Sequence, residues 1–72
     1  PGDYSLRCWL GARGDNLDGA RRDCDRAIEM DSGLASGFGN RGLVGLRQGR
    51  NIEAWEDFNT ALRVGGSDQW VA

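Results

Sequence analysis

Few residues in this sequence could carry chemistry. Histidine is absent, which removes the commonest general base and metal ligand, and no nucleophile stands beside a recognisable base. The run from Gly37 to Gly42 has the GxGxxG spacing of a dinucleotide-binding loop, but a polar segment precedes it where that motif needs a strand. We interpret its glycines as places of close helix packing. The sequence therefore predicts neither an enzyme nor a cofactor site.

Cys8 and Cys24 are the candidates for covalent chemistry. They flank a turn centred near Gly14 and Asp15, so two antiparallel helices would hold them at similar heights. A disulfide would require Cα atoms within about 7 Å and an oxidising compartment. The alternative is that Cys24 is a buried free thiol at a core position. Two cysteines without histidine predict no metal site.

Two charged motifs are better explained by turns and helix surfaces. Arg13-Gly14-Asp15 is a tripeptide that some adhesive proteins display, but here Gly14 fits a positive-φ helix end and Asp15 or Asn16 can cap the next helix. A run of mixed charge follows, and Asp18 and Arg22 in it have the spacing of a surface ion pair. We expect a solvated, ion-paired helix face rather than a catalytic carboxylate pair from Arg21, Arg22, Asp23, Asp25, Arg26, Glu29 and Asp31.

Helices must position these residues, because no alternating β-branched run predicts a strand. Small and apolar residues between Asn16 and Asp31 recur mostly at spacings of three and four, the pattern of one helix face. Gly49 and Asn51 are typical of a helix end followed by a helix start. We expect helices over about Tyr4–Ala12, Leu17–Met30, Leu34–Gln48 and Ile52–Val64, with a further helix beginning in Ser67–Ala72.

The second of these helices matches the fourth when the sequence is displaced so that Ala20 falls on Ala54. Cys24 then falls on Phe58, and Ala27 on Ala61. We call this displacement of 34 positions the repeat shift. A fixed period of this length indicates a stacked repeat protein. The whole chain is short enough to be at most one domain. We divide it into a first repeat over about 3–31, a second over 32–66 and the start of a further helix at 67–72.

This organisation resembles the tetratricopeptide repeat, a helix–turn–helix unit of about 34 residues. Residues on that family's signature positions are Phe38, Gly42, Gly49, Ala54, Phe58 and Ala61 in the second repeat, with Ala20, Cys24 and Ala27 in the first. The first helix fits after deletion of one residue near its turn, which makes Leu6 and Leu10 its core positions. The resemblance implies an all-α fold in which hairpins stack as a short right-handed α-solenoid.

The resemblance also implies a concave groove that receives an extended peptide. Carried over to the third helix, the groove residues would be Ser36, Gly39, Asn40, Leu43, Leu46 and Arg47. Asn40 could hydrogen-bond a peptide backbone, and Leu43 and Leu46 could form an apolar shelf. The alternative is that both leucines simply pack on a neighbouring helix. The lysine clamp that grips a C-terminal carboxylate in some relatives is missing, because the chain has no Lys.

We therefore expect a protein-interaction scaffold whose partner is a protein or peptide that the sequence does not identify. The alternative is a structural spacer or oligomerisation segment of a longer array, which self-associates through exposed repeat ends. Nine basic and eleven acidic residues are interspersed, which predicts no nucleic-acid partner. No apolar run approaches the ~18 residues of a membrane span.

Source and compartment receive only indirect signals. All nine basic residues are Arg, which favours a bacterium with a GC-rich genome. Arg7-Cys8-Trp9 with Asp23-Cys24 is similar to a subgroup of bacterial repeat proteins, many of them exported. We therefore expect a periplasmic or exported protein ahead of a cytoplasmic one. The first residue is Pro1, which we interpret as a processed product or a piece of a longer chain.

Overall fold

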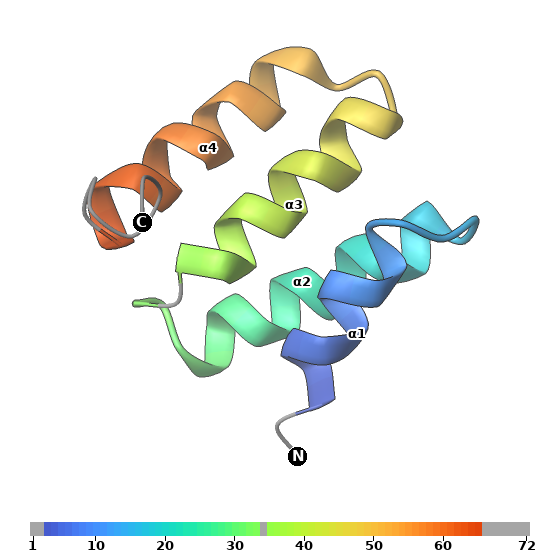
Figure 1. The fold of residues 1–72 in the computed structure, drawn as a ribbon, viewed down its shortest axis with the longest axis horizontal. Coiled ribbons are helices and arrows are strands. Elements are labelled where there is room, and N and C mark those ends of the chain that lie inside the picture. The colour runs from blue at the N-terminus through green and yellow to red at the C-terminus, as the bar shows by residue number, and fades with distance from the viewer. Residues whose placement is uncertain (1–2, 34, 66–72) are drawn as a thin grey trace.

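The computed structural model describes residues 3–33 and 35–65, and all the regular structure in them is helical (Figure 1). The four helices are α1 (Asp3–Gly11), α2 (Leu17–Met30), α3 (Ala35–Arg47) and α4 (Asn51–Gly65). The predicted all-α fold is confirmed, and each helix begins and ends within one residue of its predicted bounds. The further helix predicted over 67–72 lies outside the described residues.

The helices form two antiparallel hairpins that pack side by side (Figure 1). Helices α1 and α2 make the first hairpin, and α3 and α4 make the second. Helix α3 lies between them, since it contacts α4 within its own hairpin and both α2 and α1 across the boundary. Helix α3 therefore makes most of the contact between the two hairpins.

Local capping explains where the helices begin and end. Asn16 Oδ1 accepts a hydrogen bond from the Gly19 amide (3.1 Å) and caps α2, as predicted. Gly49 has a φ of +81° just after α3, as a terminating glycine should. The same prediction for Gly14 is wrong, because Gly49 is the residue with positive φ among those described. The chain leaves α1 instead through a tight turn in which the Gly14 amide donates a hydrogen bond to the Gly11 carbonyl (3.0 Å).

Small residues dominate the core, which lies where the two hairpins meet. Helices with small facing side chains can approach closely: a Cβ added to Gly11 would lie 2.6 Å from Ala20 Cβ. In the second hairpin, a Cβ added to Gly45 would lie 3.4 Å from Ala54 Cβ, so the helices approach less closely there. The buried core consists of Cys8, Ala12, Ala20, Cys24 and Val44, with Leu17 and Leu43 packed against it.

The expected core positions of the first helix are wrong. Leu6 and Leu10 are exposed, whereas Cys8 is fully buried. The repeat shift applied without a break fits better, because the Gly11–Ala20 contact then coincides with the Gly45–Ala54 contact. No deletion is needed, since Cys8 and Gly11 face α2 in place of the two leucines.

Candidate functional site

A shallow pocket of about 360 Å³ lies along α1 and α3 and reaches α4. It collects four of the six predicted groove residues on one surface: Ser36, Gly39, Asn40 and Leu43. Their spacing along α3 follows one face of a helix. Trp9 from α1 and Phe58 from α4 complete the lining. We call this six-residue surface the α1–α3 groove.

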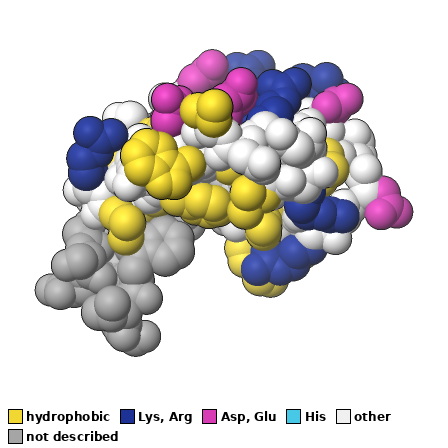
Figure 2. Space-filling view, turned by 90° about the horizontal axis from the view of Figure 1, so that it is seen from above, with side chains coloured by type: hydrophobic (Ala, Val, Ile, Leu, Met, Phe, Trp, Pro, Cys, Tyr) yellow, Lys and Arg dark blue, Asp and Glu magenta, His cyan; other side chains and the backbone are white. Residues whose placement is uncertain are grey.

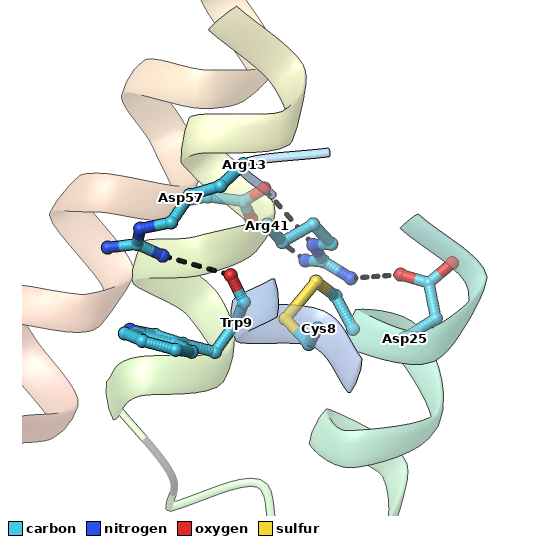
Figure 3. The surroundings of a disulfide bond; sticks show 7 residues. Cys8, Trp9, Arg13, Asp25, Arg41 and Asp57 are labelled. Carbon is cyan, nitrogen blue, oxygen red and sulfur yellow. Dashed lines mark hydrogen bonds and ion pairs between the residues drawn. A yellow bond between two sulfur atoms is a disulfide. The ribbon is translucent and has the colours of Figure 1, made fainter. Parts of the chain in front are cut away.

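Trp9 is the groove residue that sequence reasoning missed. Its side chain is 45% exposed, and the guanidinium of Arg13 lies 4.3 Å from its ring centroid. Arg13 also donates a hydrogen bond to the Trp9 carbonyl (2.9 Å), so the stacked arrangement is held from both sides (Figure 3). The period contained the missing signal, because the repeat shift carries Trp9 onto Leu43.

The structure does not bring Leu46 and Arg47 into this groove. Arg47 Nη1 instead donates hydrogen bonds to the Ala12 and Gly14 carbonyls (2.9 and 2.6 Å), which ties α3 to the first hairpin. Leu46 is equivalent by the repeat shift to Ala12, and its side chain is 48% exposed. Leu43 fulfils both expectations, since it lines the groove and also packs against the core.

An arginine network fixes the helices behind the groove. Arg41 forms two hydrogen bonds with the Asp57 carboxylate (3.1 and 2.8 Å) and a third with Asp25 (2.8 Å), so it joins α3 to α4 and α2 (Figure 3). The hydrogen bonds with Asp57, and then the one with Asp25, raise the pKa of Arg41 above its ordinary value, although partial burial opposes this increase. Asp57 is only 7% exposed. The network was not predicted, because its members are far apart in the sequence.

The expected charged face of α2 is partly an interface. Arg26 and Glu29 form an exposed pair at 3.7 Å, as expected of a solvated surface. Arg21, however, pairs with Glu53 of α4 at 2.8 Å. Asp18 accepts a hydrogen bond from Gln48 (2.9 Å) rather than pairing with Arg22. These side chains find partners on the second hairpin because it covers this side of α2.

The two cysteines are bonded to each other in the structure (Figure 3). Their Cα atoms lie 4.6 Å apart and both side chains are fully buried between α1 and α2. The repeat shift places this bridge on the pair Gly42 and Phe58, where a Cβ on the glycine would lie 2.8 Å from the ring. Each hairpin thus has one bulky contact between its two helices, at equivalent positions. In the first hairpin this contact is the disulfide, which fixes the position of Cys8 and so of Trp9, the next residue of α1.

The GxGxxG run offers no phosphate-binding loop. Its residues lie inside α3, and beyond the first turn of a helix the backbone amides bond to carbonyls of the same helix rather than being left free for an anion. Gly37 and Gly42 are buried, as expected of packing positions. The side chains in the described part of the chain include no group of three or more that could hold a metal ion. Within residues 3–33 and 35–65, no helix is long and apolar enough to cross a bilayer.

A larger hollow of about 620 Å³ lies on α4, and its described lining residues belong to that helix. We prefer the α1–α3 groove as a ligand site because three helices bound it and a stacked tryptophan stands at its edge. Comparison with protein-family models, curated proteins and solved structures finds no match to this chain.

Proposed function

We propose that this chain is a tetratricopeptide-like module, part of a right-handed α-solenoid, that binds an extended peptide segment of a protein partner in the α1–α3 groove. The observation that supports this most is the convergence of Trp9, Asn40 and Phe58 from three helices on one open hollow. The groove combines apolar surface with a small number of polar groups, the composition typical of a recognition site.

The chemistry of the lining defines the expected ligand. Trp9, Leu43 and Phe58 offer apolar surface for one side chain, and the Asn40 amide can donate to and accept from a peptide backbone. Burial of one apolar side chain contributes about 1.5–3 kcal/mol, and one hydrogen bond adds about 1 kcal/mol. A single anchor of this kind supports only weak binding, so we expect dissociation constants of about a millimolar or somewhat weaker.

The disulfide and the arginine network make the groove rigid in this proposal. The Cys8–Cys24 bridge holds the residue next to Trp9, and Arg41 holds α3 against α4, from which Phe58 projects. A preformed groove loses little conformational entropy on binding. A buried disulfide also favours an oxidising compartment, which supports the expectation of a bacterial periplasmic or exported protein.

The test is selection from a random peptide library displayed in many copies on each phage, so that avidity retains weak binders, followed by calorimetric titration of the selected peptides. We expect Trp9→Ala to weaken binding at least about tenfold, because a tryptophan anchor carries much of the affinity of a binding site. Asn40→Ala should have a smaller effect. Trp55→Ala is the matched control, since Trp55 is an exposed tryptophan on α4 outside the groove.

Two results would contradict this function. The first is a library that yields no peptide above background for the folded, oxidised chain. The second is a set of peptides whose binding is lost in Trp55→Ala and kept in Trp9→Ala, which would move the site to α4.

A further inference from the structure

The contact between the two hairpins is built from a definite set of positions. On the first hairpin these are the Ala12 and Gly14 carbonyls, which bind Arg47, and three charged side chains of α2. Those side chains are Asp18, Arg21 and Asp25, which bind Gln48, Glu53 and Arg41 respectively. We use this interface as a template for a second contact. The repeat shift converts each of its first-hairpin positions to an equivalent position on the far side of the second hairpin.

The equivalent positions on the second hairpin are mostly open and apolar, with the polar Asn59 in place of Asp25. The repeat shift converts Asp18 to Ile52 and Arg21 to Trp55, which are 77% and 68% exposed. Ala12 becomes Leu46, and Ile28 becomes Leu62, both exposed as well. Figure 2, seen from the α4 side of the molecule, shows hydrophobic side chains gathered on this surface. We call Leu46, Ile52, Trp55 and Leu62 the α4 face.

The other side of the template has an equivalent at the opposite edge of the molecule. Val44 of α3 is fully buried against the first hairpin, and the reverse shift converts it to Leu10, which is 53% exposed on α1. Asn40 becomes Leu6, also exposed. Arg47 becomes Arg13, so α1 carries an arginine where α3 has the one that binds the preceding turn. We call Leu6, Leu10 and Arg13 the α1 face.

We propose that the α4 face binds the α1 face of a second copy of this chain, head to tail. The two faces are the repeat equivalents of two surfaces that already fit each other inside the molecule, which is why the occupant is another copy. Apolar side chains replace two of the template's three charged side chains, so association mainly buries apolar surface where the template has polar contacts. Arg13 of the second copy takes the place of Arg47 and donates to the carbonyls of Leu46 and Gln48.

This contact joins two different surfaces, so it leaves one free face at each end of the assembly. Such a heterologous contact need not close, and assemblies grow with concentration. Self-association needs no bound peptide, because the α4 face lies outside the α1–α3 groove. The α1 face adjoins that groove, since Arg13 stacks on Trp9 and leaves its ring to bind the second copy.

The test is the mass of the chain by sedimentation velocity over a wide range of concentration. We expect the wild-type chain to form dimers and larger species as the concentration rises. Trp55→Glu and Leu10→Glu should each remain monomeric, since each removes one of the two faces that every contact needs. An equimolar mixture of the two variants should double in mass and grow no further, because it contains one intact α4 face and one intact α1 face per pair.

Met30→Glu is the matched control. Met30 is 60% exposed, lies on α2 outside both faces, and receives the same change of charge. It should assemble as the wild type does, and far-ultraviolet circular dichroism should show that all three variants remain helical. The proposal is overturned if the wild-type chain is monomeric throughout. It is also overturned if Leu10→Glu still dimerises while Trp55→Glu does not, which would indicate a symmetric contact between two α4 faces.

Discussion

Removal of the disulfide should cost a large share of the stability of this chain. Cys8 and Cys24 are separated by 16 residues, and the chain-entropy model gives about 3 kcal/mol for a loop of roughly this length. A folded chain of 72 residues has a free energy of unfolding of roughly 4–11 kcal/mol. For a domain of this size, a loss of about 3 kcal/mol lowers the melting temperature by roughly 12–24 °C.

The assay is urea unfolding followed by circular dichroism, for the oxidised wild-type chain and for Cys8→Ala/Cys24→Ala. We expect the double variant to unfold at lower urea concentration. Its transition should also be steeper, because an unfolded chain without the cross-link exposes more surface. Treatment of the wild-type chain with a reductant should give nearly the same loss, while the double variant should not respond to reductant.

Substitutions that replace the Cys8–Cys24 pair by the equivalent Gly42–Phe58 pair test the equivalence between the two hairpins. Phe58 needs Gly42 opposite it, since a Cβ there would lie 2.8 Å from the ring. Cys24→Phe alone should therefore be less stable than Cys8→Gly/Cys24→Phe, although glycine is the poorer helix former.

Two outcomes would refute this reasoning. A loss below about 1 kcal/mol in Cys8→Ala/Cys24→Ala would mean that the cross-link hardly restricts the unfolded chain. Equal stability of Cys24→Phe and Cys8→Gly/Cys24→Phe would mean that the site in the first hairpin does not have the close packing of its equivalent.

Three further predictions concern single positions, and urea unfolding checks each of them. Gly11→Ala should destabilise the fold by about 1–3 kcal/mol, since its Cβ would lie 3.1 Å from the backbone Cα of Ala20. Gly45→Ala should be neutral or slightly stabilising, because its Cβ would meet nothing closer than 3.4 Å. Equal effects of the two substitutions would contradict the close approach of α1 and α2. Gly49→Ala should cost about 1 kcal/mol because of its positive φ, and an unchanged midpoint would argue against that conformation. Asp57→Asn should cost about 2 kcal/mol by weakening the hydrogen bonds from Arg41. Because the folded-state pKa of Arg41 is raised, its contribution is complete below the ordinary arginine pKa and is lost only as the pH rises through that higher value. The cost of Asp57→Asn should therefore be the same at neutral and moderately alkaline pH, and a cost that vanishes at alkaline pH would contradict it.

Helix bounds could be predicted closely because the signals for them are local. The stripe of small residues in α2, the Asn16 cap and the glycine at Gly49 act within one or two helical turns. Gly14 misled because glycine permits positive φ without requiring it. Four of the groove residues could also be found in advance, since their spacing along α3 follows the helical period.

The partners of the charged side chains could not be predicted in the same way. Asp25 has arginines at suitable spacings on its own helix, yet it binds Arg41 of α3. Arg47 was expected in the groove, yet it binds carbonyl groups of the first turn. Long side chains have several partners within reach in the sequence, and the packing of the hairpins selects one of them.

The sequence by itself determined the helices, their order in two hairpins and the repeat equivalence between them, because these depend on residues close together in the chain or on a repeated pattern. Only the tertiary structure decided that Arg41 joins three helices, that Trp9 and Phe58 line the same hollow, and that Leu6 and Leu10 remain exposed. Those outcomes depend on how closely α1 approaches α2 and how α3 docks between the hairpins. The small residues that permit the approach do not specify, one by one, which larger side chains it brings together.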